Sequence, residues 1–320
     1  MLRNMRLLTA ENLDPNTLTN VIDSSPFQID ILKVYHDKIY VGTSDKQISV
    51  FDLITFAEMY GDKKVETSEV ITSVCFFGEK IYVGQKNKTL EIFNYSSFDK
   101  IKKLELRGDV STLLALDASG IVVCQEDGYF DILSPYYDSI ILQDRHPFCD
   151  KINWITRTSR VGETELAIVT AGQVYFTNIE MKNSEDKGIQ IPSKVQFELD
   201  ELYIEEGAQI VRVEEYEPEK FVAFTWWTNK IYLFERSPNF LVNKGKVFSE
   251  KTRIINASFG ISFQVVGFYK IQKTKTIFLI KCKEGLIMLD AENEQMFKLN
   301  FTKSNSTIAG DLFFVQNAQK

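Results

Sequence analysis

Histidine is scarce in this chain of 320 residues, and its scarcity removes whole classes of chemistry. The two histidines, His36 and His146, lie far apart in the sequence, so they offer neither the ligand spacing of a zinc site nor the base of a recognisable triad. A glycine-rich phosphate loop and a Gly-x-Ser-x-Gly elbow are also missing. We therefore expect a protein that is not an enzyme and that needs no cofactor and no metal.

Closely spaced cysteines and long apolar runs are also lacking. The four cysteines form no Cys-x-x-Cys pair, and three of them lie in strand-like runs, which favours buried free thiols: Cys75, Cys124, Cys149 and Cys282. No run of 18 or more apolar residues occurs, and the N-terminus has no apolar core. We expect neither a signal peptide nor a membrane span, and a soluble cytoplasmic protein, with nuclear or cytoskeletal association left open.

What the chain does contain is a repeat, seen first in residues 39–52. The tetrapeptide Ile-Tyr-Val-Gly begins at Ile39 and again at Ile81, and Phe51 recurs as Phe93 at the same offset of 42 residues. Each copy alternates apolar and polar residues on both sides of a polar turn, which predicts two short, half-buried strands. A shared offset of this size indicates a repeated supersecondary unit.

Six repeats can be traced through residues 27–301, and the second shows the pattern of four short antiparallel strands most clearly. About 40 residues and four strands per repeat is the signature of a β-propeller blade. The sequence therefore predicts an all-β protein whose residues 1–320 form a single propeller domain. In the first repeat we expect the fourth strand near residues 56–60, and in the fourth repeat an inserted polar surface loop at residues 181–192.

The spacing of the repeats favours seven blades. The stretch that leads from the sixth repeat through both chain ends to the first is about two repeats long. A seventh blade would combine a C-terminal strand at 308–315, within residues 302–320, with closing strands in residues 1–26. Joining the two ends would close the ring and remove exposed sheet edges. Six blades stay an alternative, because a full set of four strands is not visible in this stretch.

The hairpins of the repeats resemble those of the WD40-repeat family of β-propellers. Phe51-Asp52 stands where that family has its Trp-Asp dipeptide, and less similar dipeptides stand at the equivalent positions Phe93-Asn94, Phe234-Glu235 and Leu289-Asp290. The repeats are degenerate, because two histidines cannot supply the family's Gly-His pair in every blade. The resemblance implies a scaffold that binds other proteins as a subunit of a larger complex, and the lysine- and asparagine-rich, proline-poor composition favours a eukaryote with an AT-rich genome. The citron-homology propeller, which is WD40-like without the dipeptide, is a related alternative.

The resemblance also implies a binding face. In WD40 proteins the turns between the second and third strands lie on the face where partners dock, so the implied partner-binding residues are those in or beside these turns: Asp45, Lys46, Lys86, Lys88, Asp127, Trp226, Trp227 and Lys283. Trp226 and Trp227 end a predicted strand, and alternation points one ring into the sheet packing and the other away from it.

Charge is gathered in two stretches of the chain. Residues 198–219 hold nine acidic residues and one arginine, and we name as the acidic arc Glu198, Asp200, Glu201, Glu205, Glu206, Glu214 and Glu215. Residues 263–283 hold five lysines and no acidic residue, and we name as the basic arc Lys270, Lys273 and Lys275. Either arc could steer a charged partner, although most charge runs are only solvated surface.

These observations support a non-catalytic scaffold first. A regulatory propeller of citron-homology type, in small-GTPase or vesicle-tethering pathways, is the second hypothesis. Nucleic-acid binding through the lysine-rich sixth repeat is the third, although the formal net charge of −7 disfavours a general nucleic-acid binder. An enzymatic role would require carboxylates that converge in the central channel of the propeller, as in some glycosidases. The sequence does not address self-association.

Overall fold

The computed structural model describes most of the chain, and its described residues form β-strands and short connections. These residues are 2–9, 21–24, 29–52, 57–61, 63–116, 120–145, 151–159, 164–170, 174–183, 190–200, 209–226, 230–235, 253–256, 267–272, 276–282, 285–290, 295–299, 304–309 and 312–317. Every regular element among them is a strand, so none of them is a helix that could cross a membrane. The chain divides into two compact units, which are Met1–Ile71 with Tyr95–Asp99 and Phe263–Lys320, and Thr72–Asn94 with Lys100–Ser262.

The first unit contains three four-stranded antiparallel sheets in its described part. The first has the order β3 (Ile29–Tyr35), β4 (Lys38–Thr43), β5 (Gln47–Asp52) and β6 (Val65–Glu66). The second has the order β23 (Gly267–Gln272), β24 (Thr276–Cys282), β25 (Gly285–Asp290) and β26 (Gln295–Leu299). The third has the order β2 (Val21–Ser24), β1 (Leu2–Thr9), β28 (Leu312–Asn317) and β27 (Ser304–Ala309). Strand β27 lies against both β3 and β23, so the three sheets pack in succession.

The second unit contains four such sheets in its described part. The first and second have the orders β7 (Ile71–Phe77), β8 (Lys80–Gln85), β9 (Thr89–Asn94), β10 (Lys100–Glu105) and β11 (Val110–Leu116), β12 (Gly120–Gln125), β13 (Tyr129–Ser134), β14 (Ser139–Arg145). The third has the order β15 (Trp154–Arg157), β16 (Thr164–Val169), β17 (Val174–Asn183) and β18 (Gln190–Asp200). The fourth has the order β19 (Gln209–Glu217), β20 (Lys220–Trp226), β21 (Lys230–Glu235) and β22 (Arg253–Asn256). Strand β11 lies against β8 and β15, and β15 lies against β19. In these contacts the first strand of each later sheet lies against the first or second strand of the sheet before it.

The core lies between neighbouring sheets, and β12 shows how the sequence builds it. Its side chains alternate between two hydrophobic clusters, because successive residues of a strand point to opposite faces. Ile121 and Val123 pack with Tyr82 of β8, whereas Val122 and Cys124 pack with residues of β15 and β16. Both faces are covered, so every residue of β12 is buried. Each large apolar side chain buried in this way contributes about 1.5–3 kcal/mol.

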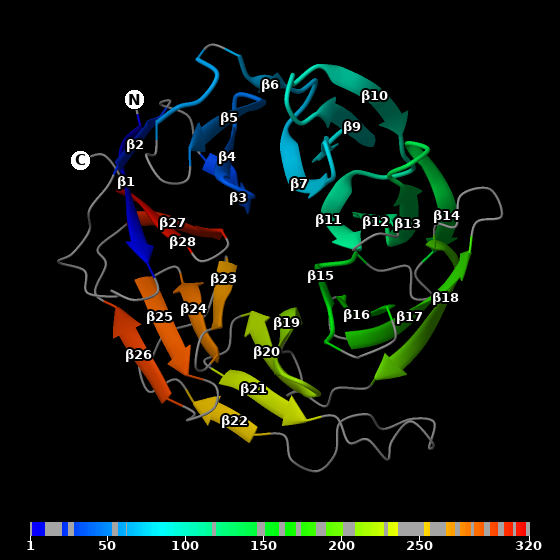
Figure 1. The fold of residues 1–320 in the computed structure, drawn as a ribbon. Helices are drawn as coiled ribbons and strands as arrows, with labels where there is room; N and C mark the ends of the chain where they lie inside the picture. Colours follow the sequence, from blue (N-terminus) through cyan, green and yellow to red (C-terminus); the bar gives the residue numbers. More distant parts are fainter. Residues whose placement is uncertain are drawn as a thin grey trace. The chain divides into compact units, whose positions relative to one another are not determined.

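The two ends of the chain share one sheet, as the spacing of the repeats predicted. Strand β1 pairs with β28 in the register Met5↔Gln316 to Thr9↔Leu312, and Figure 1 shows β1, in blue, beside β28, in red. The sequence predicted one C-terminal strand at 308–315, and this was wrong in detail. The segment belongs to two strands, β27 and β28, which pair with each other and complete four strands with β1 and β2.

The predicted fourth strand near residues 56–60 was also wrong. Glu58 forms only an isolated bridge with Phe51, with the Met59 N–H donating to the Val50 carbonyl at 2.8 Å. The chain then turns, and the short strand β6 pairs with Gln47 and Ile48 of β5. Two short segments thus share the outer edge of β5, because neither is long enough to cover it.

The insertion at residues 181–192 extends a hairpin at both of its ends instead of forming only a loop. Met181 pairs with Pro192 and Lys182 pairs with Ile191, so β17 and β18 continue into the predicted loop. Backbone pairing satisfies the polar groups of this segment. Pro192 fits β18 because the strand is at the edge of its sheet, where a missing N–H is tolerated.

Two of the four cysteines have described side chains. Cys75 and Cys124 are both buried and neither forms a disulfide, which confirms the expectation for this pair. Burial raises the pKa of the Cys124 thiol, and the nearby carboxylate of Asp131 raises it further. Cys124 is therefore an uncharged packing residue, since the thiolate is the reactive form.

Candidate functional site

The turn between β8 and β9 is held by the loop that leads to the next sheet. Asn87 and Lys88 have left-handed backbones, with φ values of 80° and 59°, and both of their N–H groups donate to Oδ1 of Asp109 at 3.0 Å. The N–H of Leu106 donates to the Lys88 carbonyl at 2.7 Å. The backbone polar groups of the turn are thus used inside the protein, while the side chains of Lys86 and Lys88 are exposed.

The same loop also holds the turn between β12 and β13. The carbonyl of Asp109 accepts a hydrogen bond from the Glu126 N–H at 2.8 Å. Gly128 completes this turn with a φ of 83°, a conformation that glycine adopts at little cost. A Cβ on Gly108 would lie 2.4 Å from Oδ1 of Asp127, so a larger residue there would displace the Asp127 carboxylate. Asp127 itself is exposed.

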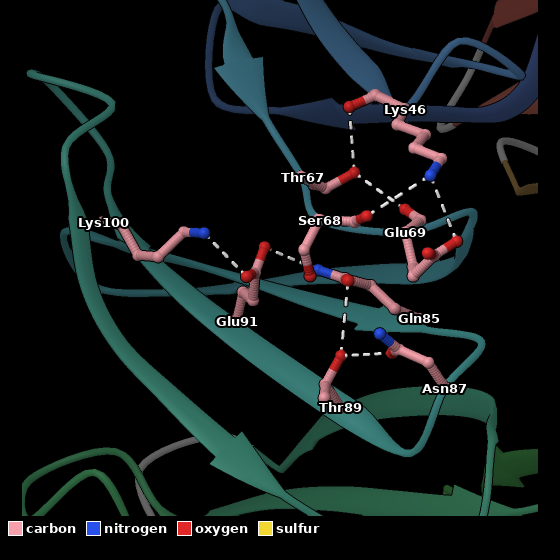
Figure 2. A network of polar contacts seen from close by, with 9 residues as sticks. All are labelled: Lys46, Thr67, Ser68, Glu69, Gln85, Asn87, Thr89, Glu91 and Lys100. Carbon is pink, nitrogen blue, oxygen red and sulfur yellow. Dashed lines mark hydrogen bonds and ion pairs between the residues drawn. The ribbon is translucent and has the colours of Figure 1, made fainter.

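A buried carboxylate lies beneath the first of these turns. Glu91 on β9 is fully buried, and its two oxygens accept hydrogen bonds from Gln85 Nε2 at 2.6 Å and from Lys100 Nζ at 2.7 Å. Thr89 donates to Oε1 of the same glutamine at 3.3 Å. Figure 2 shows this chain of contacts, which links the outer strand β10 to the end of β8. A buried charge with these partners is stabilised and fixes the strands around it.

The next sheet repeats the arrangement with different residues. Asp131 on β13 is fully buried and accepts from Gln125 Nε2 at 2.6 Å and from the guanidinium of Arg107. The Gly108 N–H donates to Gln125 Oε1 at 2.7 Å, and the guanidinium of Arg107 lies 3.7 Å from the centroid of the Tyr129 ring. Burial raises the pKa of Asp131, while Arg107 and Gln125 act in the opposite direction.

In the first unit, the turn between β4 and β5 is fixed in a comparable way. The Lys46 carbonyl accepts hydrogen bonds from the N–H and the hydroxyl of Thr67, each at 2.9 Å, and the Thr43 hydroxyl donates to Asp45. The Lys46 ammonium lies 3.2 Å from the carboxylate of Glu69. Figure 2 shows the contacts of Lys46 with Thr67 and Glu69. This lysine is partly engaged within its own unit, which distinguishes it from the exposed Lys86 and Lys88.

Glu214 of the acidic arc joins two neighbouring sheets of the second unit. Oε1 of Glu214 accepts from Trp154 Nε1 at 2.9 Å and from Arg212 Nε at 3.2 Å, and Oε2 accepts from the Thr156 hydroxyl at 3.2 Å. The guanidinium of Arg212 lies 3.4 Å from the centroid of the Trp154 ring. Burial lowers the pKa of Arg212 to about 10, and Glu214 opposes this shift. Its neighbour Glu215 is buried and accepts from two backbone N–H groups.

We expect Glu214→Gln to lower the free energy of unfolding by about 1–2 kcal/mol, because the largely buried Arg212 loses its charged acceptor. Urea unfolding at neutral pH measures the change. Glu217→Gln is the matched control: Glu217 pairs with Lys220 where both side chains are about one-third exposed, so the loss should stay below about 0.5 kcal/mol. Equal losses in the two variants would contradict the structural role of Glu214.

The other predicted site residues are only partly placed. Trp226 is the last residue of β20, Glu198 and Asp200 belong to β18, and Lys270 belongs to β23, but their side chains lie outside the described part of the structure. The remaining predicted residues lie outside the described residues: Glu201, Glu205, Glu206, Trp227, Lys273, Lys275 and Lys283. Partner binding by all of these residues stays a prediction.

Sequence reasoning did not select the residues that hold the turns. Asp109 lies between two repeats and carries no motif, so its two roles become visible only in the structure. The buried carboxylates did leave a signal, because Gln85 recurs as Gln125 and Glu91 as Asp131, both at an offset of 40 residues. A polar pair that recurs at the repeat length inside strands indicates a buried network in each repeat.

The sheets of the two units, each with four antiparallel strands, define an all-β, propeller-like fold. No protein-family model matches the chain, and no curated protein matches it. Many solved structures do match. One is the structure of U3-55K, a WD40 β-propeller, with a TM-score of 0.58 over 88% of this chain and 83% of that chain, at 11% sequence identity. At this identity the likeness shows the fold alone, and the fold is WD40-like.

Proposed function

We propose that this chain is a non-catalytic WD40-like scaffold that binds other proteins as a subunit of a larger cytoplasmic complex. In this proposal the seven sheets found in the described residues are the seven blades of one closed ring. The pairing of β1 with β28 supports closure, because it joins the two chain ends in one sheet. Closure in this way leaves few sheet edges exposed.

One observation carries the binding role: Asp109 ties the turns of two neighbouring sheets together through its side chain and its carbonyl. The exposed side chains of Lys86, Lys88 and Asp127 therefore stand on a backbone that is already ordered. A preorganised surface loses little conformational entropy when a partner binds. Charges of both signs on such a surface favour selection of one complementary partner and faster association with it.

The test is a pull-down from the native source with the tagged full-length chain at physiological salt. We expect the double variant Lys86→Glu, Lys88→Glu to reduce the recovery of the main partner by roughly tenfold, because the reversed charges repel its acidic groups. The matched control is Lys102→Glu, Lys103→Glu, which makes the same charge change at two exposed lysines of β10 in the same sheet. The control should recover the partner as the parent does.

A partner that is recovered equally with all three proteins would show that these turns are not the binding surface. Loss of the partner in the control as well would show that the change in net charge, and not the position of Lys86 and Lys88, causes the loss. Recovery of no partner by the parent would overturn the scaffold proposal itself.

A further inference from the structure

Two lysines begin identical segments of the chain, and one of them is neutralised inside the protein. Lys-Ile-Tyr-Val-Gly starts β4 at Lys38 and starts β8 at Lys80. In the second unit, Nζ of Lys80 lies 2.7 and 2.8 Å from the carboxylate oxygens of Asp138 and 2.9 Å from the Pro135 carbonyl oxygen. The hydroxyl of Tyr82 donates to the same carboxylate at 3.5 Å. The loop between β13 and β14 thus supplies this lysine with its counter-charge.

In the corresponding loop of the first unit, residues 95–99, the position equivalent to Asp138 carries no carboxylate, and the acid of this loop, Asp99, follows one residue later. Asp138 is the fourth residue after β13 and has a φ of 49°, and Phe98 is the fourth residue after β9 and has a φ of 61°. The two residues therefore hold equivalent positions in successive repeats. The phenyl ring of Phe98 is 6% exposed and packs edge-on against Tyr60, with 4.9 Å between the ring centroids. The position that holds an acid, Asp138, in one repeat thus holds an aromatic ring, Phe98, in the other.

Lys38 consequently meets aromatic rings where Lys80 meets a carboxylate. Nζ of Lys38 donates to the hydroxyl of Tyr60 at 2.7 Å and lies 4.3 Å from the centroid of the Tyr95 ring. Among the described residues no carboxylate pairs with it. Burial alone would lower the pKa of Lys38, but the hydrogen bond with Tyr60 and the interaction with Tyr95 raise it. The ammonium group is therefore charged at neutral pH.

The surroundings of Lys38 are aromatic and accessible. The ring centroid of Tyr35 lies 5.6 Å from that of Tyr95 and 4.1 Å from that of His36. Tyr60 is 39% exposed, one of the few large apolar side chains that are exposed in the described residues. Asp37 also lies in this turn and is exposed, so the surface is not strongly basic. A single carboxylate with apolar or aromatic neighbours fits this surface better than a polyanion does.

We propose that Lys38, Tyr60 and Tyr95 form a receptor for a short acidic segment of a protein partner, whose aspartate or glutamate takes the place beside Lys38 that Asp138 takes beside Lys80. The inference rests on the proposed scaffold function, which supplies a protein partner. It uses a different surface, because Lys38 begins β4 and the turn with Lys46 follows the other end of that strand.

The probe is a library of displayed short random peptides, selected on the full-length parent chain and counter-selected on Lys38→Gln. We expect the surviving peptides to depend on one aspartate or glutamate, with roughly tenfold weaker binding when that residue becomes the amide. The Lys38→Gln protein should bind them roughly tenfold more weakly, because it has lost the charge that receives the carboxylate. The control Lys63→Gln, at an exposed lysine that follows Tyr60, should bind them as the parent does.

A second pair of variants tests the equivalence of Phe98 and Asp138. Phe98→Asp should weaken peptide binding as Lys38→Gln does, because the new carboxylate would pair with the ammonium group of Lys38 and exclude the carboxylate of the peptide. Phe98→Asn loses the same ring, tolerates the same left-handed backbone and adds no charge, so it should keep binding. If both Phe98 variants fail to fold, Lys38→Gln and Lys63→Gln decide the question alone.

Surviving peptides without an acidic residue, or no surviving peptide, would overturn the proposal. Equal binding by folded Phe98→Asp and Phe98→Asn would overturn it as well. No native partner enters this measurement, so its failure leaves the pull-down result with the Lys86 and Lys88 variants untouched. A failed pull-down would likewise leave the peptide result standing.

Discussion

Replacing Gly84 by alanine should lower the free energy of unfolding by about 2–3 kcal/mol. Gly84 lies on β8, and a Cβ there would be 2.4 Å from Cγ1 and 2.8 Å from Cβ of Val110 on β11. Rotation of the valine side chain cannot relieve the contact with its Cβ, which is fixed to the backbone. The two strands would have to move apart, and the clusters packed between their sheets would loosen.

Gly42→Ala is the matched control, because Gly42 is the equivalent glycine of β4. A Cβ on Gly42 would lie 3.0 Å from Cβ of Ile31, which requires a shift of only a few tenths of an ångström. We expect its loss to be about 1 kcal/mol or less. Urea unfolding of both variants measures the difference. A Gly84→Ala protein as stable as Gly42→Ala would show that β8 and β11 adjust freely to each other.

Replacing Arg107 by methionine should lower the free energy of unfolding by about 3 kcal/mol at neutral pH. The substitution leaves the carboxylate of Asp131 fully buried without its cation, and losses of about 3–5 kcal/mol are typical of such a change. We expect the lower end of this range because the Arg107 side chain is 35% exposed. Lys151→Met is the control: it removes a pair with Glu126 in which both side chains are about half exposed, so its loss should be below about 1 kcal/mol.

The Arg107→Met deficit should shrink as the pH falls below neutral. Burial already raises the pKa of Asp131 in the folded protein, and loss of Arg107 removes a group that lowers it. An acid whose pKa is higher in the folded state than in the unfolded state destabilises the fold as the pH rises through the folded value. Protonation at lower pH relieves this cost. A deficit independent of pH would show that Arg107 acts through packing on Tyr129 instead of through charge.

The strands that carry the repeat were predictable from sequence, because their signals are local. The segments that begin at Ile39 and Ile81 alternate apolar and polar residues around polar turns, and both became central hairpins of their sheets. The outer strands were harder to predict. The long pairing of β17 with β18 and the short strand β6 depend on which sheet edge the following segment reaches. The spacing of hydrophobic residues carries little information on that pairing.

The candidate site was only half visible in the sequence. The positions of Lys86, Lys88 and Asp127 in turns between two strands followed from the repeat. That Asp109 holds both turns did not follow, because the sequence alone does not show which backbone groups a loop aspartate contacts. The same is true of Glu214, which was predicted as part of a charged arc and is bound to Trp154 and Arg212.

By itself, the sequence determined the repeat, the hairpins and the all-β class, since alternation and turn chemistry act between residues close together in the chain. Only the tertiary structure decided which charges are neutralised. Lys38 and Lys80 begin the same five-residue segment, yet one lies against Tyr60 and Tyr95 and the other against Asp138. Their partners come from loops that are distant in sequence, so packing alone brings each lysine to a ring or to a carboxylate.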